Sequence, residues 1–373
     1  GLRVLFGLVN MLSIAFVVLI VGGVQLMLQR TLDLSATWAL VVTIGFVFSY
    51  ILVGGTYAHT YTNTLQGILM VIVALVIVVD SVGVLIEPGF LSGLAERAPH
   101  LLSWTNPRST LFSSAFSVYV AGFVIGFAVV CQPHLLMKAL YLKEDRDVRR
   151  YVQVTLGVTA IFFALMLAGL AAHSAFAPGQ VPQDHVMAVW LASRFGDVPF
   201  VLISVALVAA GMSTLDGILV AMSTIASNDI FLPIAERTFL KGRARDVQAR
   251  AAFRFGQASL VALGLGAFFI CLGQPPKYLG IFGQVGVYGI LAAAVAPVVL
   301  GVVRRDAATL GGVAKLAAVA GAGTHFALYF GHFDPNPAVT ATWGIFAAAG
   351  ATVAGLAWSR RGSAVIEPVV ERG

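Results

Sequence analysis

The sequence predicts an all-α integral membrane protein with about ten membrane-spanning helices. Apolar residues make up 59% of the 373 residues, charged residues make up 11%, and the mean hydropathy is +0.91. Soluble domains carry about a quarter charged residues, so these charges are too few for a water-exposed surface. The apolar runs also lack the strict alternation of a transmembrane β-barrel. Lipid is therefore the expected solvent for most of the chain.

Ten apolar stretches have about the 20 residues that one membrane-spanning helix needs. They are residues 4–28, 36–55, 64–86, 113–136, 151–175, 185–226, 253–273, 279–302, 310–330 and 339–358. The stretch 185–226 is longer than one span, and we interpret it as a tilted or extended helix that begins at the interface near Asp184. The longest connection, residues 87–112, contains three prolines and is expected to hold a short surface helix.

The basic residues predict the orientation of these spans. When the ten stretches are threaded in and out alternately, 18 of the 23 Lys and Arg residues fall on the side that holds both ends of the chain. Cytoplasmic loops carry an excess of Lys and Arg. We therefore expect a multi-pass protein of the cell membrane with both ends in the cytoplasm. The net charge of +6 does not indicate nucleic-acid binding, because the basic residues form short runs and no basic domain.

A polar cluster in the sixth stretch is the first candidate site. Ala210, Ser213 and Thr214 are spaced i, i+3 and i+4, so a helix presents one carbonyl and two hydroxyl groups on one face. Such hard oxygen ligands suit Na⁺, and Asp216 follows directly. Small and hydroxyl-bearing residues are equally typical of close helix–helix packing in membranes. The cluster alone leaves both interpretations open.

Other polar positions within the spans allow two interpretations each. Asp80 is either an ion or proton ligand, or an interfacial residue that extends outward. Pro133, after Gln132, marks either a broken helix that lines a cavity or a simple kink. Cys131 and Cys271 lack metal-ligand or redox spacing and are expected to be small buried hydrophobic residues. No metal-spaced His pair, nucleophile elbow or phosphate loop occurs, so an enzyme is not predicted.

Taken together, these stretches resemble the sodium:solute symporter family over essentially the whole chain. Asn63 stands where the family usually has Asp, and Cys131 stands where Gly is common. The matching stretches are Tyr50, Gly54-Gly55, Thr62-Asn63 and Gln66-Gly67; Cys131 to Arg150; Ala209 to Asp216 with Ser223 and Asn228-Asp229; and Gln274-Pro275-Pro276, Gln284 and Arg304-Arg305, the last set being similar to the pantothenate and proline branches.

The resemblance implies a LeuT-type fold of five-plus-five inverted repeats, with additional C-terminal helices, in a single transporter domain over residues 1–373. Residues 1–86 would be the remainder of the first repeat, 113–302 the second repeat, and 310–358 the accessory helices. The first two core helices would then be missing, and the chain would start inside a larger protein.

The same resemblance implies a secondary active transporter that couples Na⁺ entry to uptake of a small organic solute by alternating access. Na⁺ would bind the hydroxyls of Ser213 and Thr214 and the carbonyl of Ala210. Asp216 and Asp80 are possible coupling carboxylates, and they leave H⁺ coupling open as an alternative. No cofactor other than the coupling ion is expected.

The solute would be a carboxylate, an amino acid or a vitamin-like molecule, and the possibilities include pantothenate, proline, monocarboxylates and sugars. Family members line the solute cavity at positions that here correspond to Phe127, Gln132, Gln284 and Tyr288. Two other functions stay open, namely a transporter-like sensor module and an inactive truncated transporter fragment. The expected partners are the solute and the lipid bilayer, with no nucleic acid.

Overall fold

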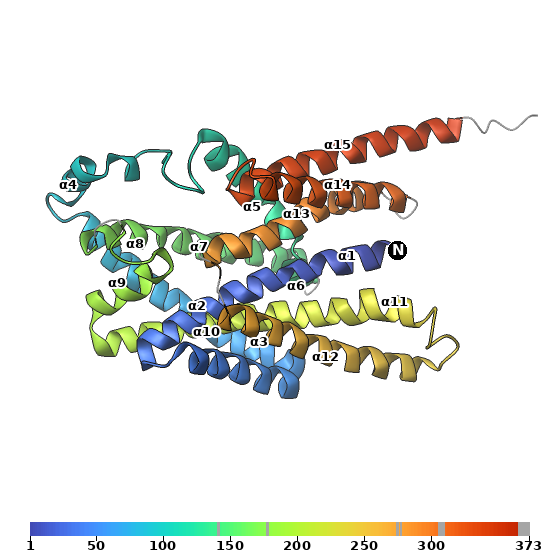
Figure 1. Cartoon of the computed structure of the whole chain (residues 1–373), viewed down its shortest axis with the longest axis horizontal. Coiled ribbons are helices and arrows are strands. Elements are labelled where there is room, and N and C mark those ends of the chain that lie inside the picture. The colour runs from blue at the N-terminus through green and yellow to red at the C-terminus, as the bar shows by residue number, and fades with distance from the viewer. Residues whose placement is uncertain (140–141, 177–178, 274–275, 277, 305–309, 365–373) are drawn as a thin grey trace, which may run out of the picture.

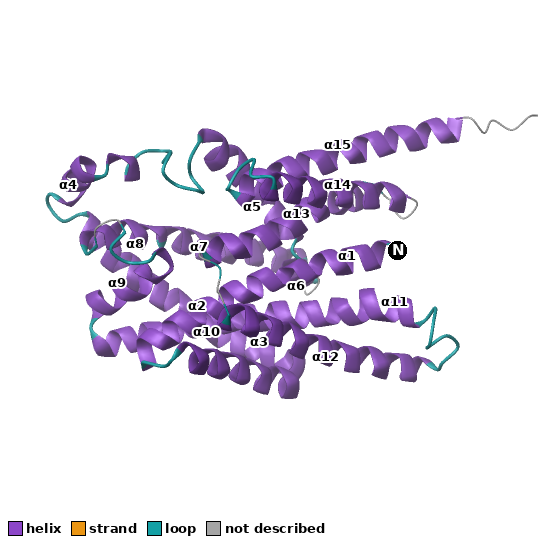
Figure 2. Ribbon diagram, in the orientation of Figure 1, coloured by secondary structure: helices purple, strands orange, loops and turns teal. Residues whose placement is uncertain are grey.

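The structure, a computed structural model, confirms the all-α membrane fold. It describes residues 1–373 except 140–141, 177–178, 274–275, 277, 305–309 and 365–373, and this described part contains helices and no strands (Figures 1 and 2). Within it, eight helical segments are long and apolar enough to cross a membrane, and two shorter apolar helices, Ala36–Ser49 and Phe116–Cys131, accompany them. These ten segments correspond to the ten predicted stretches.

The helices follow the chain in the order shown by the colours of Figure 1. Their bounds are α1 Leu2–Asn10, α2 Ile14–Leu32, α3 Ala36–Leu85, α4 Phe90–Arg97, α5 Gly122–Ala128, α6 Pro133–Ala139, α7 Asp145–Ala164, α8 Met166–Ala171, α9 Val186–Phe195, α10 Asp197–Ile225, α11 Leu232–Ala235, α12 Arg245–Leu272, α13 Leu279–Val303, α14 Gly311–Phe330 and α15 Pro337–Ala364. Short 3-10 turns and two π-helical turns, Phe116–Ala121 and Ala226–Phe231, join several of them.

Some residues singled out in the sequence fall outside this description. The side chains of residues 50, 52–62, 137–139 and 360–364 are not described, although these residues belong to helices. The residues concerned include Tyr50, Gly54, Gly55, Thr62, Gln274 and Pro275 of the matching stretches, and Lys138, Arg305, Arg360, Arg361 and Arg372, which are among the 18 basic residues on the predicted cytoplasmic side.

α3 contains two of the predicted spans, 36–55 and 64–86, in one helix of 50 residues. In a straight helix, the 20 residues from Phe46 to Gln66 would separate these residues by about 30 Å. Yet both residues line one cavity of about 380 Å³ beside Ser204 and Met212 of α10. The helix axis must therefore reverse between Phe46 and Gln66, which gives α3 two arms that both lie along α10.

The prediction of one long helix over 185–226 was wrong. Gly196 has φ +69° and ψ 179°, a backbone conformation that residues with a side chain rarely adopt. It ends α9 at Phe195 and lets α10 begin at Asp197 in a new direction. A short helix therefore lies at the end of the molecule where α4 also lies (Figure 1). The span begins with α10 at Asp197 and continues through the π-helical turn and α11 to Ala235.

Most polar side chains within the spans form their hydrogen bonds with the backbone of their own helix. Thr43 donates to the Ala39 carbonyl at 2.7 Å, and Ser81 donates to the Ile77 carbonyl at 2.6 Å, with both side chains fully buried. Hydrocarbon offers no hydrogen-bond partner, so a hydroxyl must bond within the protein. Polar residues whose bonds reach another helix are therefore the informative ones.

α13, α14 and α15 pack closely together on the upper side of Figure 1, and α2 lies between this group and α10. Gly321 makes the close packing possible, because a Cβ atom added there would lie 2.0 Å from the Ala292 carbonyl oxygen of α13. Small residues allow such close backbone approach where the hydrophobic effect does not drive helix association.

We expect Gly321→Ala to lower the stability of the folded protein by about 1–3 kcal/mol, because the new methyl overlaps the α13 backbone. Gly323→Ala on the same helix is the matched control, since a Cβ atom there meets nothing within 4 Å. This control should be neutral, or more stable by about 0.5–1 kcal/mol through helix propensity. Thermal unfolding in detergent measures both, and equal midpoints for the two variants would contradict the close packing.

Candidate ion and solute sites

α10 has two different faces in the middle of the membrane. Met212, Leu215, Asp216 and Leu219 are buried at i, i+3, i+4 and i+7 and pack against the core. The face that carries Ala210, Ser213 and Thr214 is only half-buried. The hydroxyl cluster therefore lies beside the packed seam and keeps part of its surface exposed.

The hydrogen bonds of this face bring several oxygen atoms together. The Thr214 hydroxyl donates to the Ala210 carbonyl at 3.2 Å, one turn earlier on α10. The Ser213 hydroxyl donates to the side-chain carbonyl Oδ1 of Asn63 at 2.5 Å, across to the second arm of α3. One backbone carbonyl, two hydroxyls and one amide oxygen thus lie at the junction of two helices. Uncharged oxygen atoms of this kind coordinate Na⁺ in broken-helix transporters.

Asn63 was not among the residues that the sequence assigned to the site. It is 150 positions from Ser213, and it drew attention only as a departure from the family pattern. The signal that could have found it is the polar run Thr62-Asn63-Thr64, since such residues are costly at the start of an apolar span.

Asp216 has a side chain with no exposed surface and lies on the same packed face of α10 as Met212 and Leu219. It is one turn away from Ser213 and Met212 and faces a different direction from the half-buried cluster. Its role as a coupling carboxylate stays a prediction. A buried carboxyl group in a membrane helix is costly and is often functional.

The helix around Gln132 is broken. A 3-10 turn ends at Cys131, Gln132 has extended backbone with ψ 132°, and Pro133 opens α6. Of the two sequence interpretations, the broken helix is the one observed. Gln132 is 7% exposed, which leaves its amide buried at the break.

The predicted solute-binding residues do not form one cluster. Tyr288 of α13 packs with Ile125, Ala128 and Cys131, so α5 and α13 meet beside the break at Gln132. The ring of Phe127 is 62% exposed and does not belong to that cluster. Gln284 lies one turn before Tyr288 and lines a separate cavity of about 320 Å³.

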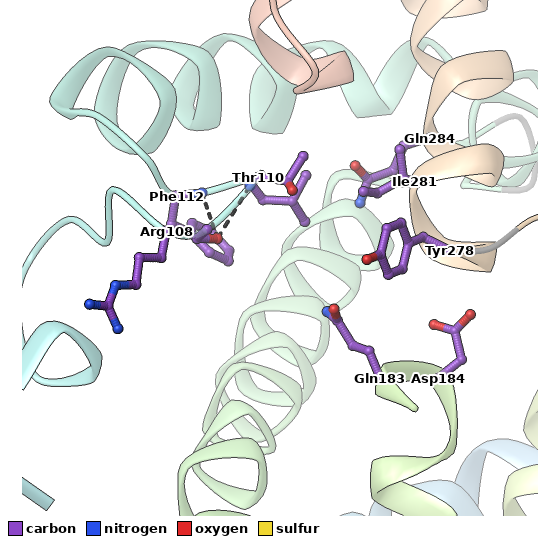
Figure 3. Close-up of a pocket in the computed structure, with 11 residues that line it drawn as sticks. Arg108, Thr110, Phe112, Gln183, Asp184, Tyr278, Ile281 and Gln284 are labelled. Carbon is purple, nitrogen blue, oxygen red and sulfur yellow. Dashed lines mark hydrogen bonds between the residues drawn. The ribbon is translucent and has the colours of Figure 1, made fainter. Parts of the chain in front are cut away.

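That cavity, named the outer cavity for the orientation proposed below, lies between residues 108–112, the turn Gln183–His185 and the start of α13 (Figure 3). Gln183, Asp184 and Tyr278 line it together with Gln284. Asp184 Oδ2 also accepts a hydrogen bond from the backbone N–H of Leu279 at 3.1 Å. The carboxylate therefore satisfies one of the open donors at the N-terminus of α13, where the helix dipole favours negative charge.

Asp80 forms an ion pair with Arg194 of α9. The Nε atom of Arg194 lies 3.1 Å from Oδ1 and 3.0 Å from Oδ2 of Asp80. This hydrogen bond, with the charge of Asp80, raises the pKa of Arg194 above its ordinary value. The pair links the end of α3 to α9, and this geometry supports the interfacial interpretation of Asp80 over an ion or proton ligand.

This chain is similar to a known protein family and to several known proteins, among them two symporters. The model of the sodium:solute symporter family matches residues 2–313. A sodium/pantothenate symporter of Haemophilus influenzae is 25% identical over 321 residues, which are 84% of this chain. The chain spans only 62% of the length of that relative. A solved structure of a substrate-bound, outward-open Na⁺-coupled sialic acid symporter has a TM-score of 0.67 at 16% identity, covering 94% of this chain and 73% of the other. This last match shows that the chain has the LeuT-like fold.

We expect Asp80→Asn to reduce stability by less than about 1 kcal/mol, because partly exposed ion pairs contribute little. The variant should also leave unchanged the Na⁺ dependence of the uptake that is proposed below. Arg194→Gln should have the same small effect, and the double variant should be no worse than either single one, because one shared contact is lost. Uptake at graded Na⁺ concentrations and thermal unfolding measure this. A several-fold change in Na⁺ dependence in Asp80→Asn alone would restore Asp80 as a coupling carboxylate.

Proposed function

Because the chain belongs to the sodium:solute symporter family, we propose that the protein couples Na⁺ entry to the uptake of a small organic solute by alternating access. The observation that carries this proposal is the group of uncharged oxygen atoms where α10 meets the second arm of α3. The LeuT-like fold supports it, because transporters of this kind place ion sites near the bilayer midplane at helix interruptions.

In the proposed site, Na⁺ binds the carbonyl of Ala210 and the hydroxyls of Ser213 and Thr214. Two observations support this arrangement. The three residues share the half-buried face of α10, so an ion can reach them without opening the packed seam. The Oδ1 atom of Asn63 already lies against Ser213 and holds its hydroxyl in place. An Asp at this position would bring a negative charge to the junction, whereas the amide of Asn63 leaves the junction uncharged.

Ion binding supplies the energy and selects the conformation. The membrane potential favours cation entry by about 2.3 kcal/mol per charge per 100 mV. Na⁺ can shift the balance between outward-open and inward-open states only if it binds one state more tightly. An ion held partly by α10 and partly by a neighbouring element meets this requirement, because relative movement of the helices changes its ligand set.

The solute is proposed to be a small organic carboxylate. The names of the two matching proteins point to pantothenate and to sialic acid. Both compounds are carboxylic acids that also carry hydroxyl and amide groups. We assign its contacts to Gln132 at the helix break and to Tyr288 beside it, with Gln284 on the outer side. Uptake should be measured for pantothenate and sialic acid, and also for proline, a monocarboxylate and a sugar.

The end of the molecule that holds Gly1 is proposed to face the cytoplasm. The turn between α11 and α12 lies at the same end (Figure 1), and it contains Arg237, Lys241 and Arg243. The excess of Lys and Arg on cytoplasmic loops supports this orientation in the cell membrane. Within the single transporter domain, we assign residues 1–86 to the first repeat, 113–302 to the second, and 310–358 to accessory helices.

Replacing Ser213 and Thr214 together by Ala should abolish Na⁺-dependent uptake by the full-length protein in proteoliposomes, because two ion ligands are lost. The matched control is Thr352→Ala on α15, whose hydroxyl makes the same one-turn-back bond, to Ala348 at 2.9 Å. The control should keep Na⁺-dependent uptake at the wild-type level.

The outcomes separate the candidate functions. Unchanged Na⁺ affinity in the Ser213→Ala/Thr214→Ala variant would reject the ion site. Na⁺-dependent solute binding without uptake would favour the sensor module. Uptake driven by a pH gradient without Na⁺ would favour H⁺ coupling, and Asp216→Asn should then abolish it. If the protein showed no solute binding and no uptake, it would be an inactive fragment.

A further inference from the structure

The outer cavity at the start of α13 has the properties of a binding site. Its volume of about 320 Å³ is within the range of small-ligand pockets, roughly 300–1,000 Å³. Residues from three separate segments of the chain line it, namely the stretch 108–112, the turn Gln183–His185 and α13. No residue of α10 or of α3 lines it, so it is separate from the proposed ion site.

Polar side chains converge on this cavity. In Figure 3, Gln183 and Asp184 extend from below toward Tyr278 and Gln284, and Thr110 approaches from the opposite wall. The guanidinium group of Arg108 points away from this space (Figure 3). Two cavities beside α3 differ from the outer cavity in their lining. One is lined mainly by Val, Leu and Phe, and the other mainly by Ile, Val and Met. The outer cavity is therefore more polar than these two, and its residue Gln183 also lines a neighbouring cavity together with His173.

The loop that forms one wall is fixed to an accessory helix. Asn336 is 1% exposed, and its Nδ2 atom donates to the Leu111 carbonyl at 2.7 Å. The Oδ1 atom of the same side chain accepts from the Ala338 N–H at 2.9 Å and so caps α15. Within the loop, Ser109 Oγ accepts from the N–H groups of Leu111 and Phe112 at 3.3 and 3.2 Å (Figure 3).

The opposite wall is fixed as well. Asp184 holds the N-terminus of α13 through Leu279, as described above. His325 of α14 is fully buried, and its Nε2 atom lies 3.0 Å from the carbonyl of Val285, the neighbour of Gln284. Hydrogen bonds within the protein thus hold both walls, and a site with ordered walls avoids the free-energy cost of ordering them on binding.

We propose that this cavity is an outer binding site for the uncharged, hydroxyl- and amide-bearing part of the solute, which the solute occupies before it moves inward past Gln284. The inference rests on the proposed function. The amides of Gln183 and Gln284 each donate and accept hydrogen bonds, and the Thr110 hydroxyl does the same. These groups match solute hydroxyls and amides, whereas Asp184 is engaged by α13. The site needs no Na⁺, because it shares no residue with the ion cluster.

Thiol protection tests the site directly. A Thr110→Cys variant places a thiol at the cavity wall, while Cys131 and Cys271 are only 8% and 3% exposed and should not react. The rate of labelling by a membrane-impermeant maleimide is measured without Na⁺, with pantothenate or sialic acid as the probe. At a probe concentration ten times its Kd, labelling should slow by about tenfold. Acetate, which has a carboxylate but no hydroxyl or amide, should give no protection.

Matched variants locate the effect. Ser103→Cys carries its thiol on the same connection but outside the cavity lining, and the probes should not protect it. In the Thr110→Cys background, Gln183→Ala should remove most of the protection. Asn336→Asp keeps an acceptor for Ala338 but cannot donate to Leu111, so it should weaken protection and speed labelling. Gln248 lies on α12 and does not line the cavity, so Gln248→Ala should change the labelling rate neither with nor without the probe.

The outer site and the proposed function can fail separately. Protection that persists in the Ser213→Ala/Thr214→Ala variant, where coupled uptake is lost, supports an outer site that is independent of the ion. Uptake of a probe without any protection at Thr110→Cys overturns the outer site and leaves the transport function intact. Protection by neither probe overturns the outer site as well. Protection without uptake supports the site and counts against transport.

Discussion

A polar side chain inside a lipid bilayer must find its hydrogen-bond partner within the protein, and this requirement organises the structure around α10. Most hydroxyls in the spans meet it by bonding to the carbonyl one turn earlier on the same helix, as Thr43 and Ser81 do. Ser213 instead reaches Asn63 on the second arm of α3. That contact joins two spans at the depth where Ala210 and Thr214 present their oxygen atoms.

The same requirement explains why the two candidate sites lie where they do. The ion cluster lies on the half-buried face of a spanning helix, where uncharged oxygens avoid the cost of a charge in hydrocarbon. The outer cavity lies at the helix ends, where the backbone N–H of Leu279 and the carbonyl of Leu111 need partners and receive them from Asp184 and Asn336. Asn336 at the start of α15 thereby holds one wall of the proposed solute entrance, and His325 of α14 holds the other through the Val285 carbonyl.

Much of the fold could be predicted from the sequence, because span length and apolar content are local properties. The ten stretches correspond to observed segments, and the structure selects the broken helix at Gln132-Pro133 from the two interpretations that the sequence left open. The break at Gly196 was missed, since one glycine inside an apolar run does not reveal its positive φ. The reversal within α3 followed from the two predicted spans, but their joint packing along α10 did not.

Partners that are distant in the sequence were beyond prediction. Ser213 and Asn63 are 150 positions apart, and Asp80 and Arg194 are 114 apart. Helical periodicity says which face a residue occupies but not which helix covers that face. Asp80 therefore allowed two interpretations until its ion pair was seen, and Asn336 gave no sign that it holds a loop 225 positions away.

The most direct measurement is a pair of high-resolution density maps of the protein, one determined in Na⁺ and one in choline. The account predicts ion density between the Ala210 carbonyl and the hydroxyls of Ser213 and Thr214 in Na⁺ alone. It also predicts that the Thr214 hydroxyl then turns its oxygen to the ion and gives up its hydrogen bond to Ala210. A Na⁺ map without density there, with the bond from Thr214 to Ala210 intact, would contradict the assignment.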